Sequence, residues 1–161
     1  MKKNTVLKGF TLVELIVVIA IIGVLAAILV PSMLGYVTKA KFSAINSSAK
    51  TLYNAAMVAC REEDVTHPIP NGIYTKDGAQ SSEYNKTLCD HIYEYFPKIT
   101  GSEWAVEVQG DNAVAACLQK KSGDGYVGTF PTSNNERGSL VGSDGVVSFS
   151  TALEFAKNQT S

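Results

Sequence analysis

The chain has 161 residues, which is enough for one folded domain and one additional segment, and its 45% apolar content supports a packed core. The net charge is only -1, and because Lys2, Lys3 and Lys8 all lie in the first nine residues, the remainder carries -4. Proteins that bind nucleic acid usually present a basic surface to the phosphates, so this balance argues against that class.

Residues 10–38 are predicted to form an apolar helix. No residue between Glu14 and Lys39 is charged, and about 20 apolar residues suffice to cross the hydrocarbon core of a bilayer. A secretory signal peptide would have a shorter apolar stretch, no acid in it and a small-residue cleavage site. We therefore predict a membrane anchor. The lysines that precede it favour a cytoplasmic N-terminus, with the residues after 38 outside the cytoplasm.

Glu14 is unexpected in such a segment, because a carboxylate near hydrocarbon costs several kcal/mol unless it is paired. The stretch KGFTLVELIVVIAIIGVLAAILVP, residues 8–31, resembles the N-terminal signature of type IV prepilins and pseudopilins. That signature is a short basic leader ending in glycine, then Phe-Thr-Leu-x-Glu, an apolar helix and a proline. The resemblance covers residues 1 to about 40.

The resemblance implies that a prepilin peptidase cuts between Gly9 and Phe10 and that the new amine of Phe10 is methylated. It also implies that Glu14 neutralises the Phe10 amine of a neighbouring subunit. Opposite charges about 4 Å apart attract by about 4 kcal/mol at an effective dielectric constant near 20, which is enough to select one register among apolar helices. The chain then divides into a leader (1–9), a transmembrane and filament-core helix (10–38) and a globular domain (39–161).

The same helix is predicted to continue to about Arg61, because its apolar residues keep recurring three and four positions apart. That stripe consists of Phe42, Ile45, Ala49, Leu52, Ala56 and Ala59. Glycine and proline weaken a helix, so a bend or an unwound stretch is expected around Gly23 and Pro31, with a tolerated kink as the alternative.

Residues 62–82 contain two prolines and two glycines without any period, which predicts a loop. A short helix is predicted at 83–96, ended by Pro97. Strands are predicted at 104–109, 113–119 and 126–131, a further strand at 142–150, and a C-terminal helix at 150–158 with Thr151 and Glu154 as a capping box.

A two-residue turn at Gly110 and Asp111 would pair the first two of these strands as a hairpin. Gln109 then pairs with Asn112, and one face of the hairpin is expected to pack on the helix stripe. The side chains predicted on this face are Trp104, Val106, Val108, Ala113, Ala115 and Cys117.

The three cysteines would lie outside the cytoplasm, where disulfides persist. Cys60, Cys89 and Cys117 are an odd number, so at most one internal bridge leaves a thiol, and both the pairing and the alternative of three free thiols stay open. His67 and His91 have no ligands at metal spacing. Glu136 and Asp144 are the only candidates for a calcium loop. Neither a metal nor a cofactor is expected.

We therefore predict an α+β fold in which the outer half of a long N-terminal helix packs on an antiparallel sheet, as the pilin resemblance implies. No catalytic arrangement is apparent, so an enzyme is not expected. The resemblance implies a homo-oligomeric type IV pilus-like filament, with the prepilin peptidase, the assembly machinery and the membrane as partners. It also suggests roles in adhesion, motility or DNA uptake. The alternatives are a type II secretion pseudopilin and a minor or tip pilin that binds through loops 62–82 and 131–145.

Overall fold

The structure is a computed structural model that describes residues 9–64, 69–76 and 83–158. The chain divides into two compact units, the first ending at Thr38 and the second beginning at Lys39. Helix α1 runs from Leu12 to Asp64 without interruption and contributes to both units. It confirms the long N-terminal helix, including its continuation beyond the apolar run.

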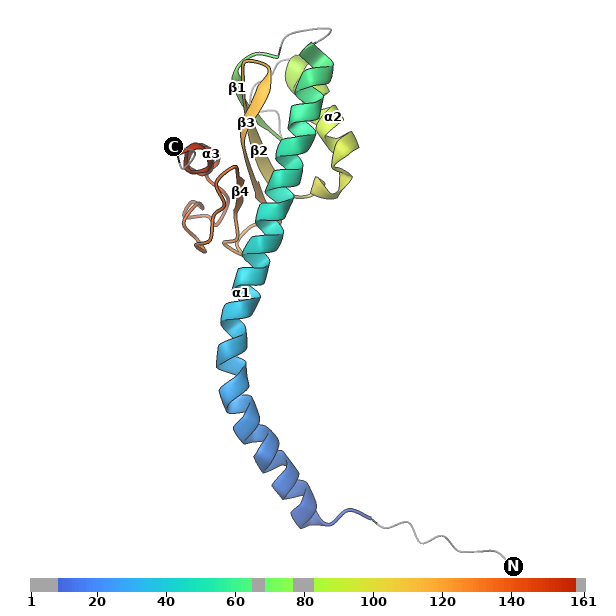
Figure 1. Cartoon of the computed structure of the whole chain (residues 1–161), viewed down its shortest axis with the longest axis vertical. Helices are drawn as coiled ribbons and strands as arrows, with labels where there is room; N and C mark the ends of the chain where they lie inside the picture. The colour runs from blue at the N-terminus through green and yellow to red at the C-terminus, as the bar shows by residue number, and fades with distance from the viewer. Residues whose placement is uncertain (1–8, 65–68, 77–82, 159–161) are drawn as a thin grey trace, which may run out of the picture. The chain divides into compact units, whose positions relative to one another are not determined.

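In the described residues of the second unit, α1 is followed by a four-stranded antiparallel sheet, two further helices and a single 3-10 turn. These elements are β1 (Gly72–Thr75), α2 (Glu83–Tyr95), η1 (Pro97–Ile99), β2 (Glu103–Gln109), β3 (Asn112–Gln119), β4 (Gly128–Phe130) and α3 (Phe149–Lys157). The strands lie in the order β1-β2-β3-β4, and each pairs with the next. In Figure 1 the outer half of α1 and helix α3 lie on different sides of this sheet.

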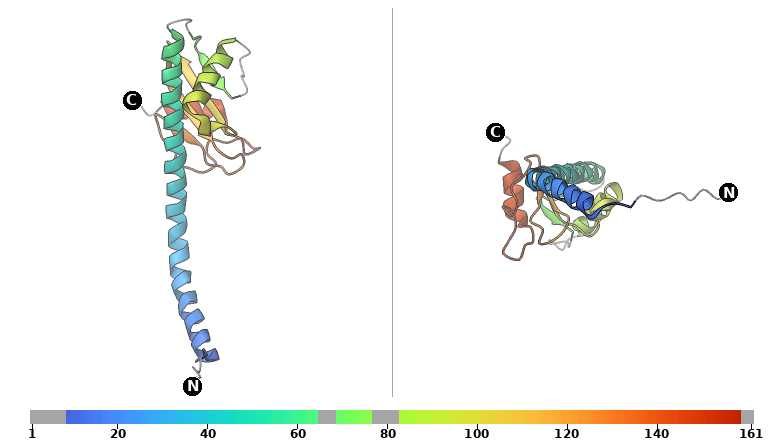
Figure 2. Two further views of the ribbon diagram at one scale, coloured as in Figure 1. Left: turned by 90° about the vertical axis from the view of Figure 1, so that its right-hand side faces the viewer. Right: turned by 90° about the horizontal axis from the view of Figure 1, so that it is seen from below.

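The face of the sheet beneath α1 forms the larger core. All six residues of the helix stripe are buried, with Ala49 and Leu52 completely inaccessible, so the periodicity prediction is confirmed. Trp104, Val106 and Val108 of β2 belong to the same cluster, as do residues of α2. Figure 2 shows α2 beside the outer part of α1. Tyr95 of α2 donates a hydrogen bond to the Glu62 carboxylate of α1 (2.6 Å to Oε1), and this bond raises the pKa of Tyr95 to about 12.

The opposite face of the sheet forms a smaller core beneath α3. It contains Ala105 from β2 and Ala115 and Cys117 from β3, packed against Ala152 and Leu153 of α3. The sheet therefore separates two apolar layers, one closed by α1 and the other by α3.

A β-bulge in β3 makes part of the predicted hairpin face wrong. Gln109 pairs with Asn112 and Val108 with Ala113 as predicted, but Glu107 pairs with Ala115, which leaves Val114 as an extra residue. Since side chains alternate along a strand, one extra residue transfers every following side chain to the other face. Ala115 and Cys117 consequently lie in the smaller core, while Ala116 and Leu118 take their places in the larger one.

Three other predictions need correction. The region predicted as a loop at 62–82 contains β1, which pairs with β2 and is too short to show a period. The strand predicted at 142–150 is reduced to a single bridge between Val141 and Val147. Helix α3 begins at Phe149, with Ser148 rather than Thr151 at its N-cap, and no side chain caps it by a hydrogen bond. The helix predicted at 83–96 is confirmed as α2.

Strand β4 lies directly against the backbone of α1. A Cβ atom built on Gly128 would come within 2.3 Å of the carbonyl oxygen of Ile45, so only glycine fits this contact. Beside it, Asn46 of α1 accepts a hydrogen bond from the Thr129 backbone N–H (3.0 Å) and donates one to the Asn134 carbonyl (2.8 Å). One helix side chain thus joins α1 both to β4 and to the loop that follows.

Candidate functional site

The segment with the strongest functional signature is the start of the described chain. Gly9 and Phe10 precede α1 in non-helical backbone, and the Phe10 side chain is 88% exposed. A Cβ built on Gly9 would meet no atom within 4 Å. The backbone at the predicted cleavage position is therefore uncovered in this structure. Residues 1–8 of the predicted leader lie outside the described residues.

Glu14 is held by Thr11 at the first turn of α1. One carboxylate oxygen, Oε2, accepts hydrogen bonds from the backbone N–H of Thr11 (2.9 Å) and from its hydroxyl (2.8 Å). The Glu14 backbone N–H in turn points to the Thr11 hydroxyl oxygen at 3.3 Å. This is a capping box, in which the cap residue and the acid three positions later satisfy each other's polar groups. The second oxygen, Oε1, accepts no hydrogen bond from any residue that the structure describes.

Thr11 was missed as a functional residue in the sequence, although its signal was present. The pattern Thr11-Leu12-Val13-Glu14 is the Thr-x-x-Glu spacing of a capping box immediately before an apolar run. The acid therefore has two separate features. One oxygen is hydrogen-bonded within its own chain, and the other has no hydrogen-bond donor among the described residues.

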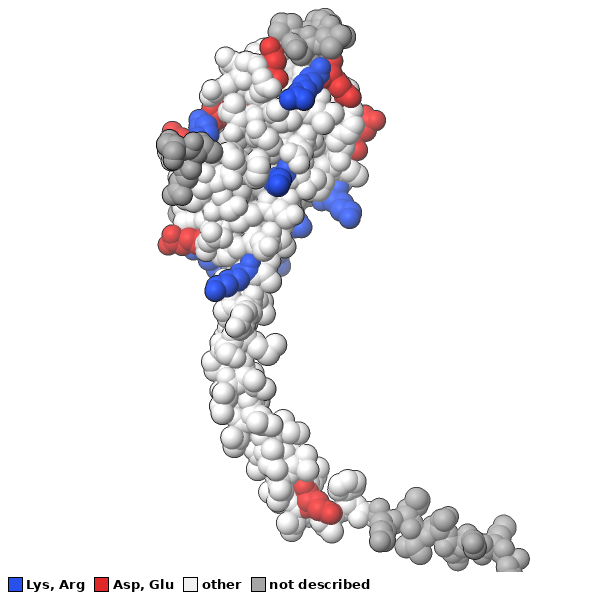
Figure 3. Space-filling model, viewed as in Figure 1, with Lys and Arg blue, Asp and Glu red and all other residues white. Residues whose placement is uncertain are grey.

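The helix beyond Glu14 presents a continuous apolar surface. Every large apolar side chain from Leu12 to Val37 is at least 47% exposed. Figure 3 shows this segment in white, with a single red group near its start, in agreement with Glu14 as the only charged residue between 9 and 38. By length and composition, α1 is the one described helix able to cross a membrane. Gly23 and Pro31 lie within the uninterrupted helix, so the expected alternative of an unwound stretch there is wrong, whereas a bend stays a prediction.

All three cysteines are buried, and the sheet separates Cys117 from the other two. Cys60 and Cys89 lie in the core beneath α1, whereas Cys117 lies in the core beneath α3. Burial raises the pKa of Cys117 and of Cys60 to about 12, and that of Cys89 to about 11. All three thiols are therefore held in the protonated form, which is the unreactive one.

The buried Cys117 thiol predicts a loss of stability at alkaline pH. Between about pH 9 and 12 the thiol of the unfolded chain loses its proton while the folded chain keeps it, so the unfolded state binds fewer protons. The free energy of unfolding should then fall by about 1.4 kcal/mol per pH unit from this thiol alone. Urea unfolding of the full chain in a neutral detergent, followed by the fluorescence of the single buried Trp104, measures the slope. Cys117→Ala should flatten it by that amount, and equal slopes would contradict the assignment.

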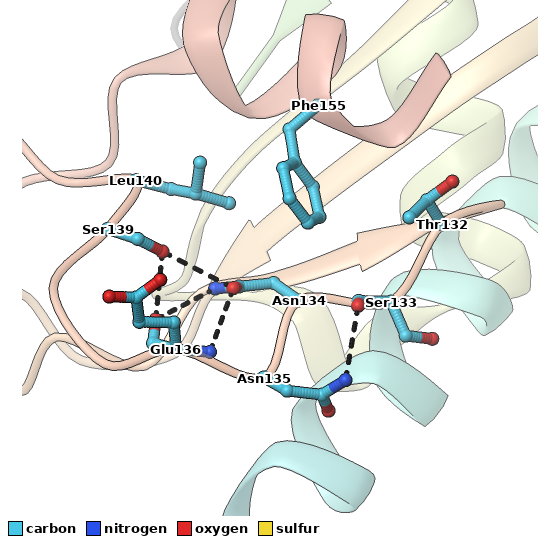
Figure 4. A pocket seen from close by; sticks show the side chains of 8 residues that line it. All are labelled: Thr132, Ser133, Asn134, Asn135, Glu136, Ser139, Leu140 and Phe155. Carbon is cyan, nitrogen blue, oxygen red and sulfur yellow. Dashed lines mark hydrogen bonds between the residues drawn. The ribbon is translucent and has the colours of Figure 1, made fainter. Parts of the chain in front are cut away.

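A shallow depression of about 510 Å³ lies between the 132–139 loop and α3, with Phe155 above it (Figure 4). Asn134 shapes the loop from beneath. Its buried amide donates to the Val127 carbonyl (3.0 Å) and accepts from the Glu136 backbone N–H (3.0 Å). Within the described residues, no three histidine, cysteine or acidic side chains gather as metal ligands, around Glu136 and Asp144 or elsewhere. His91 Nδ1 lies 3.1 Å from Glu62, and His67 lies outside the described residues.

Comparison with known proteins identifies the family. Residues 8–30 match the model of the prokaryotic N-terminal methylation motif. The chain is 32% identical to the fimbrial protein of Pseudomonas aeruginosa over 127 residues, which cover 78% of this chain and 77% of that protein. It is also 38% identical to the type IV major pilin protein PilE of Neisseria gonorrhoeae over 78 residues, 48% of this chain and 42% of that protein. The chain belongs to the type IV pilin family.

Matches to other pilins cover smaller shares of the chain. Against the type IV major pilin protein PilA of Myxococcus xanthus, the identity is 42% over 57 residues, which is 35% of this pilin and 26% of that one. The chain thus spans between about a quarter and about half of the first four pilins compared, and about three quarters of the Pseudomonas protein. No solved structure gives a significant match. The motif and the apolar helix together fit a membrane-anchored precursor.

Proposed function

We propose that this chain is a structural subunit of a type IV pilus filament. Residues 1–9 form a leader that a prepilin peptidase removes on the cytoplasmic side, and the amine of Phe10 is then methylated. Residues 10–38 hold the subunit in the membrane until the helix moves into the filament core, and residues 39–161 form the domain displayed on the cell surface. The methylation motif at 8–30 and the pilin relatives support this sequence of events.

The observation that carries the proposal is the arrangement of Glu14. It is the only charge on the exposed apolar part of α1 before Lys39, and Thr11 fixes one of its oxygens while the other accepts no hydrogen bond from a described residue. Cleavage after Gly9 produces a cation at Phe10 in every subunit. An amine and a carboxylate brought together between apolar helices attract by about 4 kcal/mol, whereas the apolar surfaces alone give no preferred offset. The pair therefore selects the register in which subunits add to the filament.

Head-to-tail contacts of this type are open, because each subunit uses its Glu14 toward one neighbour and its Phe10 toward another. Repeated contacts that do not close produce a filament rather than a ring. The relatives above are named major pilins or fimbrial proteins, which favours a pilus subunit over a secretion pseudopilin or a minor tip protein.

The intact mass of filaments sheared from cells tests this proposal. The expected subunit begins at Phe10 and carries one added methyl group. Gly9→Val serves as the control, because a branched side chain at the cleavage position should leave the full precursor in the membrane and no sheared material. Filaments whose subunits still begin at Met1 would contradict the proposal. Masses measured with and without reduction also show whether two of the thiols form a bridge.

A further inference from the structure

Two positive side chains from distant parts of the sequence meet over one aromatic ring. The Nζ atom of Lys41, on α1, lies 4.9 Å from the centroid of the Tyr126 ring, and the guanidinium carbon of Arg137 lies 5.2 Å from it. The Tyr126 ring itself packs on Phe42, with the centroids 5.1 Å apart. Attraction between each cation and the electron-rich ring holds both charges within about 5 Å of the centre of the same ring.

Hydrogen bonds also fix the orientation of the Arg137 side chain. Its Nε donates a 2.8 Å hydrogen bond to the Asp124 carbonyl, and the neighbouring Gly138 N–H donates to the Gly125 carbonyl at 2.9 Å. A Cβ on Gly125 would come within 3.2 Å of the Arg137 Cγ atom, so the glycine lets the arginine lie along the turn. In the described part of the chain, the two terminal nitrogens of the guanidinium make no hydrogen bond. These two nitrogens form a planar pair of hydrogen-bond donors.

Among the described residues, no acidic side chain forms an ion pair with either of these two cations. The Asp124 carboxylate accepts a hydrogen bond from the Tyr126 backbone N–H (3.0 Å), and Glu136 precedes Arg137 in the exposed loop. Neither forms an ion pair with Lys41 or Arg137 among the described residues. A preoriented arginine fork beside a lysine, without a carboxylate partner, is suited to a phosphate group.

The position of Lys41 in the sequence indicates which phosphate is available. The uncharged run ends at Thr38, and Lys39 and Lys41 are the first charged residues after it. Three residues of helix advance about 4.5 Å, whereas the headgroup region on each side of a bilayer extends about 5 to 8 Å beyond the hydrocarbon. Tyr36, just before the end of the run, is a residue type enriched at that boundary. Lys41 therefore falls in the headgroup layer, and Arg137 shares its ring.

We propose that Lys41 and Arg137, held over Tyr126, bind the phosphate of an anionic phospholipid headgroup at the outer surface of the anchoring membrane. The arginine fork contacts two phosphate oxygens, and the lysine supplies a second charge. This contact holds the globular unit at the membrane before assembly and must break when the subunit is extracted. The inference rests on the membrane anchorage proposed above, but not on filament formation.

Native mass spectrometry of the full chain tests the inference. The purified protein, in dodecyl maltoside, is mixed with equal amounts of phosphatidylglycerol and phosphatidylcholine that carry the same acyl chains. The wild-type chain is expected to retain phosphatidylglycerol in preference to phosphatidylcholine. Each charge near an anionic lipid surface contributes about a five-fold preference, so Lys41→Gln and Arg137→Gln should each lower the retained ratio about five-fold.

Lys50→Gln is the matched control. Lys50 also lies on α1 over an aromatic ring, 5.7 Å from the Phe130 centroid, but nine residues beyond Lys41 and thus about 13.5 Å farther along the helix. Its substitution should leave the lipid ratio unchanged. Thermal unfolding of each variant verifies that the fold is intact.

Equal retention of the two lipids by the wild-type chain, or an unchanged ratio in the Lys41→Gln, Arg137→Gln double variant, would overturn the inference. So would a change in self-association with no change in lipid ratio, because the cluster would then bind a second copy of the chain. A protein recovered from membranes without detergent would instead contradict the anchorage. The two proposals therefore fail by different results.

Discussion

Cells that produce the Glu14→Ala chain should process it normally but assemble no filaments. In the function proposed above, the peptidase acts at Gly9 and Phe10, which this substitution leaves in place, whereas the carboxylate proposed to pair with a neighbouring amine is lost. A registering attraction of about 4 kcal/mol corresponds to roughly a thousand-fold change in the equilibrium for adding a subunit. Sheared filament yield should fall below detection, while mass spectrometry of the membrane fraction should show a subunit that begins at Phe10.

Glu14→Gln tests whether the charge of the side chain at position 14, rather than its shape, directs assembly. The amide keeps the length of the side chain and an oxygen that can accept the hydrogen bonds from Thr11. Since it carries no charge, it should assemble as poorly as the alanine variant. Normal filaments from Glu14→Gln would show that charge neutralisation does not direct assembly. A processed Glu14→Ala chain that assembles would remove the role of Glu14 altogether.

Gly128→Ala should destabilise the globular unit severely. The added methyl would lie 2.3 Å from the Ile45 carbonyl oxygen and 2.5 Å from its carbon, and both atoms belong to the backbone of α1. Neither can rotate away, so β4 must separate from the helix, which also strains the hydrogen bonds of Asn46. We expect a loss of about 3 kcal/mol, at the upper end of over-packing costs. Urea unfolding followed by Trp104 fluorescence measures it.

Gly142→Ala is the comparison for this variant. Its added methyl would meet the carboxylate oxygen Oδ1 of Asp144 at 2.9 Å, which is the end of a flexible side chain. The side chain can move, so the loss of stability should stay below about 1 kcal/mol. If the two alanine variants unfold at the same urea concentration, the contact between β4 and α1 does not contribute what the geometry implies.

The long helix was predictable because its signal repeats. A stripe of six apolar residues at helical spacing identifies both the element and the face that it buries, and all six are buried. The α+β class and the first pairs of the β2–β3 hairpin followed from equally local patterns, namely alternation and a two-residue turn. Glu14 was recognisable as a candidate for subunit contacts because a lone acid in an apolar run requires a partner.

Features that depend on tertiary contacts were not predictable. Nothing in the sequence around Val114 marks it as a bulge, yet this one residue decides that Cys117 faces α3 instead of α1. Strand β1 is four residues long and exists because β2 lies beside it. The meeting of Lys41 and Arg137 over Tyr126 joins α1 to a distant loop, and no local spacing encodes such a contact.

The order of strands in the sheet has a consequence for how the subunit matures. Each strand pairs with the one that precedes it in the chain, so the sheet can grow strand by strand as the polypeptide emerges, with little loop-closure entropy at each step. Helix α3, the last described element, is also the lid of the smaller core. Until it docks, the surface that carries Cys117 is uncovered. With the topology proposed above, the compartment outside the cytoplasm has access to this thiol during biogenesis, and loses that access once the C-terminal helix is in place.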